Sequence, residues 1–405
     1  MGILDEISDR EVWKYFLEDK TDRGLLSKRE IREISIFVEE ERYVPLADEL
    51  RSFCRGRFPV PEKKEINKKG TGKKRTVYCF DRDMTMMLKL IGYLLYRYDS
   101  RIDPRCYSFR RSLSAKNAVR DIVSIKGISD MWFYKTDVHD YFNAIPPERL
   151  ASVLDSIVDD DPALLAFLKG LILQNECRRG DEIITEKRGA MAGVPLSSFF
   201  ADIYLKELDA KFRDTGIEYF RYSDDIIIFA PTEDMMLGGK AIIESTLQRA
   251  GLEVNPEKES SGSPGEPWEF LGFRYENGQI RLSVVSLSKI KAKIRRKARS
   301  LYRWRKRKEV DFEKTAGKMI RIFNGKFYDD SGENGFTWSR WFFPVITDPT
   351  DLREIDRYLI ENIRYLRSGR HYKGNYKVTY EDIKALGFRS LYSEYYRFRE
   401  ARLSE

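Results

Sequence analysis

The sequence predicts an α+β fold, because two hydrophobic patterns alternate along its 405 residues. Short aromatic and β-branched runs, such as MWFYKTD at 131–137 and IEYFRYSDDIIIFA at 217–230, are typical of buried strands. Longer segments with apolar residues at helical spacing, such as MTMMLKLIGYLLYRY at 84–98, indicate helices. A third signal is the Asn277-Gly278 pair inside WEFLGFRYENGQIRLSV, which predicts a two-residue hairpin turn.

The first part of the chain combines polar helices with a basic hairpin. Residues 1–60 are expected to be helical. The segment 62–80, EKKEINKKGTGKKRTVYCF, predicts a hairpin-like loop around Gly70 and Gly72. Its cations are Lys63, Lys64, Lys68, Lys69, Lys73, Lys74 and Arg75.

The middle of the chain predicts strands that end in acidic residues. The strand at 131–137 ends at Asp137, and the strands within 217–230 join at Ser223, Asp224 and Asp225. Asp161 followed by Pro162 predicts a helix start, and Gly216 predicts the end of the helix that contains FFADIYLKELDAKF. A further helix is expected to end at Gly251.

The last third of the chain is expected to be mostly helical. In the stretch 289–308, twelve of twenty residues are Lys or Arg and none is acidic. Ile290, Ile294, Ala298 and Leu301 keep helical spacing there, so this helix can pack on one side and present charge on the others. Capping boxes are expected at 351–354 and 379–382. The predicted segments are 1–60, 61–285, 286–310 and 311–405.

Composition excludes several classes of protein. The 73 Lys and Arg residues exceed the 65 Asp and Glu residues, so the net charge is +8. The four cysteines form no C-x-x-C pair, and with only two histidines no zinc site has recognisable spacing. The charged N-terminus lacks the apolar core of a signal peptide, and every apolar run is too short to cross a bilayer. We therefore expect a reduced cytoplasmic protein without a membrane partner.

Asp137, Asp224 and Asp225 are candidate ligands for metal ions that catalyse nucleotide transfer. Such chemistry needs two ions about 4 Å apart, bridged by carboxylates, and Mg²⁺ prefers oxygen ligands. The alternative for Asp224 and Asp225 is a solvated hairpin tip, where Asp is common. Their apolar flanks favour the metal site, because adjacent acids near a core repel each other unless a cation compensates them.

With these flanks, YSDD resembles the Y-x-D-D box of reverse transcriptases, and the other blocks stand in that family's order. They are KKRTVYCF, CYSFRRSLSAKNAV, KTDVHDYFNAI, GAMAGVPLSSFFADIYL, GLEVNPEK and FLGF. The resemblance covers about residues 60–310. It implies a right-hand polymerase with fingers and an antiparallel-sheet palm at 61–285, a basic thumb helix at 286–310 and a helical C-terminal extension.

The resemblance also implies roles for individual residues. The implied metal ligands are Asp137, the Val138 carbonyl, Asp224 and Asp225, which would hold two Mg²⁺ ions, with Mn²⁺ as a substitute. The implied nucleotide-binding residues are Lys68, Arg75, Asp140, Tyr141, Phe142, Ala192, Gly193 and Lys258. Phe142 would stand at the sugar-selecting position. The implied primer grip is Phe270, Leu271 and Gly272. Backbone contacts to nucleic acid are expected from Lys289, Lys293, Arg295, Arg296, Arg299 and Arg303.

Two departures from the family pattern point to a subgroup. Ala192 replaces the usual glutamine of the template block, and Ser198 replaces the usual proline. This variant resembles bacterial defence-associated and abortive-infection reverse transcriptases. It implies antiviral defence with DNA made on an RNA template, a structured noncoding RNA as partner, and deoxynucleoside triphosphates as substrates. Oligomeric state stays open. The rivals are a retron or intron reverse transcriptase and a non-catalytic RNA-binding scaffold with a polymerase fold.

Overall fold

The computed structural model describes residues 2–52, 58–67, 74–187, 189–328 and 337–403. The chain divides into two compact units. Unit 1 comprises Met1–Arg23 and Arg29–Glu266, and unit 2 comprises Gly24–Lys28 and Pro267–Glu405. Helices and mainly antiparallel sheets confirm the α+β prediction. None of the helices within the described ranges combines the length and apolar character that a membrane span requires.

The N-terminal helices of unit 1 have their own aromatic core. Trp13 is fully buried, its rings contact Phe16, Phe37 and Tyr43, and its Nε1 donates a hydrogen bond to the Ile7 carbonyl at 2.9 Å. Residues 3–52 are therefore mostly helical, as predicted, whereas 58–60 are not helical and 53–57 lie outside the described residues. The helices are α1 (Ile3–Glu6), α2 (Arg10–Asp22), α3 (Lys28–Glu39) and α4 (Tyr43–Ser52).

The basic segment forms the predicted hairpin. Strands β1 (Glu62–Asn67) and β2 (Lys74–Cys79) pair antiparallel, with Asn67 opposite Lys74. They belong to a four-stranded sheet of order β2-β1-β4-β5, completed by β4 (Glu176–Arg179) and β5 (Glu182–Thr185). The tip, 68–73, lies outside the described residues, so the structure gives no position for Lys68, one of the predicted nucleotide-binding residues.

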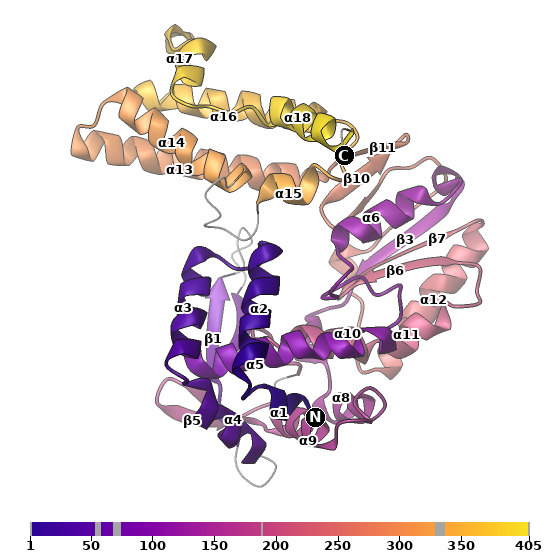
Figure 1. Ribbon diagram of the computed structural model, residues 1–405. Coiled ribbons are helices and arrows are strands. Elements are labelled where there is room, and N and C mark those ends of the chain that lie inside the picture. The colour runs from indigo at the N-terminus through magenta and orange to yellow at the C-terminus, as the bar shows by residue number, and fades with distance from the viewer. Residues whose placement is uncertain (1, 53–57, 68–73, 188, 329–336, 404–405) are drawn as a thin grey trace. The chain divides into compact units, whose positions relative to one another are not determined.

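A second four-stranded sheet carries the acidic residues. Its order is β6-β7-β3-β8, and every pairing is antiparallel. Its strands are β6 (Glu218–Tyr222), β7 (Asp225–Ala230), β3 (Trp132–Asp137) and β8 (Ser260–Gly262). Residues 226–230 are fully buried, and α12 (Glu233–Arg249) packs against β3 and β7 (Figure 1). Both predicted strand regions are therefore confirmed.

The remaining elements of unit 1 connect these sheets. Asp161 accepts a hydrogen bond from the Leu164 amide at 3.0 Å and starts a helix at Pro162, as predicted. The elements are α5 (Arg82–Leu94), η2 (Leu95–Arg101), α6 (Ala115–Ser124), η3 (Ile128–Asp130), α7 (Tyr141–Ala144), α8 (Pro147–Asp155), α9 (Pro162–Leu173), α10 (Ser197–Tyr204), α11 (Lys206–Lys211) and η4 (Pro256–Lys258).

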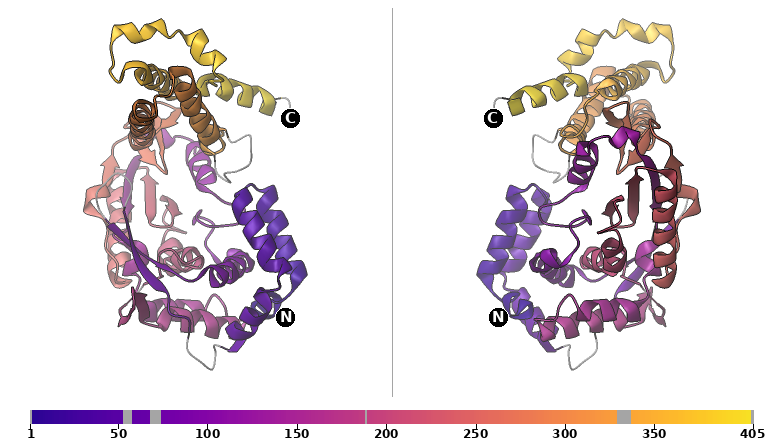
Figure 2. Two further views of the ribbon diagram at one scale, coloured as in Figure 1. Left: turned by 90° about the vertical axis from the view of Figure 1, so that its left-hand side faces the viewer. Right: turned by 90° about the vertical axis from the view of Figure 1, so that its right-hand side faces the viewer.

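Unit 2 consists of a small antiparallel sheet and a helical layer. Its strands are β9 (Trp268–Phe270), β10 (Phe273–Glu276) and β11 (Gln279–Leu282), in the order β11-β10-β9. Asn277 and Gly278 have positive φ in the β10–β11 turn, as that hairpin signal predicted. The long helix α13 (Val284–Lys308) runs beside α16 (Thr350–Ser368), and its buried residues are the predicted Ile290, Ile294, Ala298 and Leu301 (Figures 1 and 2).

The other elements of unit 2 are α14 (Phe312–Phe327), α15 (Trp338–Phe342), η5 (Lys373–Lys377), α17 (Tyr380–Ala385) and α18 (Leu391–Leu403).

One predicted capping box is confirmed and the other is wrong. Thr379 and Asp382 cap α17 reciprocally. Helix α16 instead begins at Thr350, so Asp351 lies inside its first turn. The Asp351 carboxylate accepts a hydrogen bond from the Leu282 amide at 3.1 Å, because the end of β11 approaches the helix there.

Candidate metal and nucleotide site

Two segments distant in the sequence bring three carboxylates together. Strands β3 and β7 pair so that Asp137 lies opposite Asp225. Asp224 precedes β7 in the β6–β7 turn, and its carbonyl accepts a hydrogen bond from the Val138 amide at 3.1 Å. One oxygen from each of Asp137, Asp224 and Asp225 lies within 4.8 Å of the others, which is close enough to hold a metal ion.

Burial and mutual repulsion make this cluster unfavourable without a cation. Burial raises the pKa of Asp224 to about 7, and repulsion from Asp225 and Asp137 adds to the shift. Burial and repulsion from Asp137 also raise the pKa of Asp225. Oxygen donors crowded in this way fit a divalent ion that prefers carboxylate ligands, because the ion would stabilise their charged forms.

Lys258 and Asn255 hold Asp137 in place. Lys258 Nζ lies 2.5 Å from Asp137 Oδ2, and Asn255 donates through Nδ2 to Asp137 Oδ1 at 3.3 Å. Burial lowers the pKa of Lys258, but its hydrogen bond and ion pair with Asp137 outweigh burial, so the net direction is upward. Lys258 therefore remains charged and offsets part of the acidic cluster.

Two of the predicted nucleotide-binding residues, Arg75 and Phe142, lie against each other. The Arg75 guanidinium on β2 lies 5.6 Å from the centre of the Phe142 ring. Phe142 lies on the short helix α7, because the chain turns after β3 at Asp140, whose φ is +42°. Phe142 is fixed there by its carbonyl, which accepts the Ala190 amide at 2.7 Å.

The template block packs directly on the fingers hairpin. The Ala192 carbonyl accepts the Tyr78 amide at 2.8 Å. Gly193 has φ +101°, and an added Cβ would lie 3.0 Å from the Tyr78 carbonyl oxygen. A side chain at Gly193 would therefore disturb β2, the strand that carries Arg75.

The other predicted nucleotide-binding residues differ from each other in exposure. Asp140 is exposed, whereas Tyr141 is buried and donates its hydroxyl to the Ala201 carbonyl at 2.6 Å. Their roles toward a nucleotide stay predictions.

Unit 2 contains the predicted primer grip. Phe270 is fully buried at the end of β9, and Leu271 and Gly272 turn the chain into β10 with φ of +50° and +90°. The Gly272 carbonyl accepts the Ser283 amide at 2.8 Å, which fixes this turn against the start of α13. The turn is present, and its contact with a primer stays a prediction.

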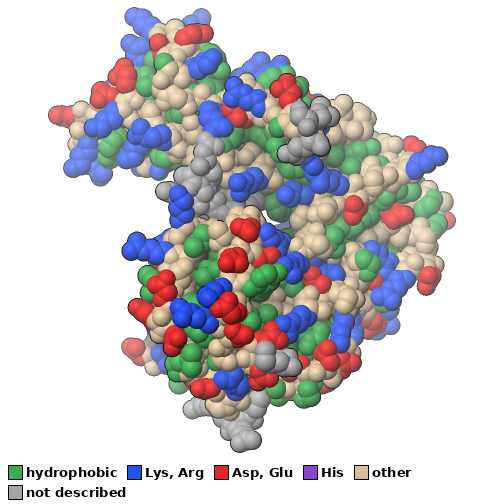
Figure 3. All heavy atoms as spheres, in the orientation of Figure 1, with side chains coloured by type: hydrophobic (Ala, Val, Ile, Leu, Met, Phe, Trp, Pro, Cys, Tyr) green, Lys and Arg blue, Asp and Glu red, His purple; other side chains and the backbone are tan. Residues whose placement is uncertain are grey.

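The cations expected to contact nucleic acid are all exposed on α13. Lys and Arg side chains gather where α13 and α14 meet (Figure 3). Among the described residues, Arg295, Arg296 and Arg299 form no ion pair, whereas Arg305 donates to the Leu366 carbonyl at 2.7 Å. The exposed set is Lys289, Lys293, Arg295, Arg296, Arg299 and Arg303.

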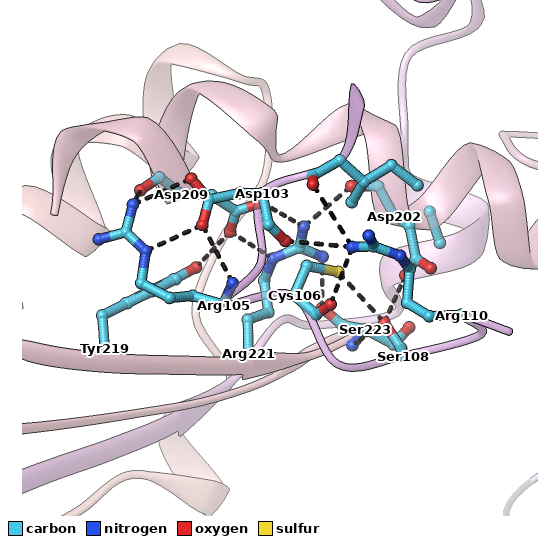
Figure 4. Close-up of polar contacts among 12 residues, drawn as sticks. Asp103, Arg105, Cys106, Ser108, Arg110, Asp202, Asp209, Tyr219, Arg221 and Ser223 are labelled. Carbon is cyan, nitrogen blue, oxygen red and sulfur yellow. Dashed lines mark hydrogen bonds and ion pairs between the residues drawn. The ribbon is translucent and has the colours of Figure 1, made fainter. Parts of the chain in front are cut away.

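Sequence reasoning missed a buried polar network beside the β6–β7 turn (Figure 4). Arg221 and Asp209 have 0% exposed side chains and form a bidentate pair, with Nε–Oδ1 and Nη2–Oδ2 distances of 2.7 and 2.5 Å. Ser108 and Asp202 complete the network. An arginine between the aromatic residues of EYFRYS was the available signal, because a strand core does not accept an unpaired charge.

Comparisons with known proteins bear on the region that holds the carboxylates. A family profile described as Reverse transcriptase (RNA-dependent DNA polymerase) matches residues 66–275, more than half of the chain. No curated protein sequence matches significantly.

Two solved telomerase structures also match. Apo telomerase from Candida tropicalis, truncated from its C-terminal domain, has a TM-score of 0.44 and 16% identity, covering 56% of this chain and 55% of that one. Telomerase from Candida albicans in complex with a TWJ fragment of telomeric RNA has a TM-score of 0.46 and 13% identity, covering 88% and 70%. The chain thus spans about half of the first telomerase.

Proposed function

This chain belongs to the reverse transcriptase (RNA-dependent DNA polymerase) family, and on that premise we propose that it adds deoxynucleotides to a 3′ hydroxyl on an RNA template. The observation that carries the proposal is the meeting of Asp137, Asp224 and Asp225 at the ends of paired strands. In the reaction the 3′ oxygen bonds to the α-phosphorus, its proton passes to solvent, and pyrophosphate leaves.

The residues of the site have distinct tasks in this proposal. Asp137, Asp224 and Asp225 would hold two divalent ions, proposed to be Mg²⁺, which supply charge stabilisation at the attacking and leaving oxygens. Lys258 orients Asp137 through its ion pair. Arg75 provides positive charge for the triphosphate. Phe142, whose ring lies against Arg75, excludes sugars that carry a 2′ hydroxyl.

Primer extension tests the proposal. The purified protein, an RNA template, a DNA primer and deoxynucleoside triphosphates are incubated with Mg²⁺, and extension is measured for wild type, Asp137→Asn and Asp224→Asn. We expect extension by wild type and a decrease of about 1,000-fold or more in each variant, because each substitution replaces a charged ligand by a neutral group of similar size. Extension by Asp224→Asn at the wild-type rate would contradict the metal assignment.

The finer proposal is a role in antiviral defence with a structured noncoding RNA. It is supported by Ala192 and Ser198, the departures that resemble defence-associated reverse transcriptases. Sequencing the RNA and DNA that copurify with the protein from its cells tests this proposal. One RNA and its complementary DNA would support it, whereas copies of a mobile element would favour the retron or intron alternative.

A further inference from the structure

A fully buried ion pair beside the β6–β7 turn requires an explanation. The Arg221–Asp209 pair is removed from water, and the desolvation of two charges offsets much of their attraction. Apolar residues of similar volume often stabilise a core equally well. The pair therefore suggests a function other than stabilising the fold, and the other hydrogen bonds of Arg221 indicate what that function is.

Arg221 reaches the turn that carries the acidic residues. Its Nη1 donates to the Ser223 carbonyl at 3.3 Å, and its Nη2 donates to the Asp202 carbonyl at 2.9 Å. Asp209, on α11, fixes the guanidinium plane from the other side. The orientation of the Ser223 carbonyl is thus tied to a helix outside the sheet.

Ser108 holds the other backbone polar group of Ser223. The Ser223 amide donates to Ser108 Oγ at 2.8 Å, and Ser108 Oγ donates to Asp202 Oδ1. Ser223 has φ +58°, a left-handed conformation that an L-residue other than glycine adopts at a cost. Both backbone polar groups of this strained residue are therefore held by side chains from outside the turn (Figure 4).

Ser223 immediately precedes Asp224 and Asp225 in the turn. Tyr222 pairs with Asp225 across that turn. A change in the Ser223 backbone would therefore alter the direction of both carboxylates.

We propose that Ser108, Asp202, Asp209 and Arg221 form a hairpin clamp that positions Asp224 and Asp225 to bind divalent metal ions. These four are positioning residues, since they act through the backbone of Ser223. The inference rests on the proposed function, because it assigns metal binding to the same site. Groups that orient metal ligands commonly affect metal affinity or activity by about 10- to 100-fold when removed.

Ser108→Ala is the direct test, because it leaves the buried Ser223 amide without its acceptor and changes little volume. The matched control is Thr246→Val on α12. It also deletes a buried hydroxyl of unit 1, one that accepts a hydrogen bond from Lys211 Nζ at 3.1 Å. For wild type and both variants, Mn²⁺ affinity is measured by electron paramagnetic resonance. The kcat and KM for deoxynucleotide, the Mg²⁺ dependence of extension and the Tm are also measured.

We expect Ser108→Ala to weaken Mn²⁺ binding about tenfold and to raise the Mg²⁺ concentration for half-maximal extension similarly. The kcat should fall by about tenfold or more with little change in KM, and Thr246→Val should resemble wild type in all metal readouts. Mn²⁺ affinity of Ser108→Ala equal to that of wild type would overturn the clamp. If wild type binds Mn²⁺ but does not extend a primer, the proposed polymerase activity is contradicted. The Mn²⁺ affinities of wild type and Ser108→Ala would then still decide whether the clamp exists.

A double variant separates positioning from folding. Arg221→Met with Asp209→Leu removes both charges of the buried pair at once, so neither charge is left unpaired. The Ser223 and Asp202 carbonyls lose their donor and the Tyr219 hydroxyl loses its acceptor, so the Tm should fall whichever role the pair has. Below that Tm, a purely structural role predicts intact Mn²⁺ affinity, whereas the clamp predicts the weaker Mn²⁺ binding expected for Ser108→Ala. Wild-type metal affinity in this double variant would contradict the role of Arg221.

Discussion

The neighbours of an aspartate in this protein determine what its raised pKa means for the molecule, as Asp224 and Asp202 illustrate. Asp202 is buried and Asp224 is half-buried, and loss of contact with water raises the pKa of each to about 7. Asp224 lies among like charges that a metal ion would offset. Asp202 instead faces a guanidinium, a hydroxyl and a thiol, each of which favours its charged form.

Asp202 makes stability depend on pH. Burial raises its pKa from 3.8 to about 7, although Arg221, Ser108 and Cys106 favour the charged form, and Asp209 adds repulsion. Because the folded-state pKa is raised, the stabilisation is complete below about pH 4 and is lost as pH rises toward 7. We expect the stability of Asp202→Asn relative to wild type to rise by about 2–4 kcal/mol between about pH 4 and pH 8. Urea unfolding at both pH values measures this, and an equal pH dependence in both proteins would contradict it.

Phe142 is expected to exclude ribonucleotides. If the sugar lies between the metal site and Arg75, a 2′ hydroxyl would collide with the Phe142 ring. The hydrogen bond from the Ala190 amide to the Phe142 carbonyl holds α7 in place, so the ring cannot move aside. Phe142→Val should therefore raise ribonucleotide incorporation relative to deoxynucleotide incorporation by about tenfold or more.

Competing single-nucleotide extensions with matched ribo and deoxy substrates measure this ratio. Phe167→Val, a core substitution on α9, is the control that lowers stability by about 1–3 kcal/mol without changing sugar preference. An unchanged ratio in Phe142→Val would make Phe142 a core residue only. A wild type that prefers ribonucleotides would favour an RNA polymerase.

Among the elements, α13 combines a narrow apolar stripe with a broad cationic surface. Its stripe packs on α16, Arg305 binds backbone carbonyls at the C-terminal end of α16, and Lys291 pairs with Glu354. Lys318 of α14 lies 4.2 Å from the centre of the Trp304 ring, so this aromatic residue is already engaged by a cation within unit 2. The exposed arginines of α13 are available to bind phosphates.

Charge reversal of Arg295, Arg296 and Arg299 to Glu should weaken binding to unrelated nucleic-acid sequences alike. Phosphate binding releases counterions, so the slope of log affinity against log salt should become shallower by about 0.7–0.9 for each phosphate that the variant no longer neutralises. Binding measured across a salt series tests this. The control reverses Lys373, Lys377 and Lys384, three exposed cations elsewhere in unit 2, with the same change in net charge. A wild-type slope in the α13 variant would exclude this helix from nucleic-acid binding.

At the scale of the whole molecule, two cores of different construction stabilise the chain. Unit 1 combines two four-stranded sheets with helices, whereas the core of unit 2 is built mainly between α13, α14 and α16. Units with separate cores commonly unfold separately.

We expect two unfolding transitions in urea. Leu247→Ala on α12 and Leu359→Ala on α16 remove equivalent buried side chains from units 1 and 2. Each should destabilise one transition by about 2–5 kcal/mol and leave the other unchanged. A single transition that both substitutions shift equally would show that the two units fold as one.

The sequence by itself predicted many of the helices and strands, and it predicted the three carboxylates that the structure brings together. Aromatic and β-branched runs located β3 and β7, helical spacing located the buried stripe of α13, and Asn277-Gly278 located a turn, because these signals depend on neighbouring residues. The acidic pair at 224–225 stood out since its flanks are apolar.

Only the tertiary structure decided how these elements meet. The register that places Asp137 opposite Asp225 depends on strands far apart in the sequence, and the ion pair of Lys258 with Asp137 depends on the same fold. The hairpin clamp joins Ser108, Asp202 and Arg221 from three segments, and its charges are paired only after folding. Local patterns cannot specify such interactions, because burial and pairing of a polar side chain are set by residues distant in the sequence.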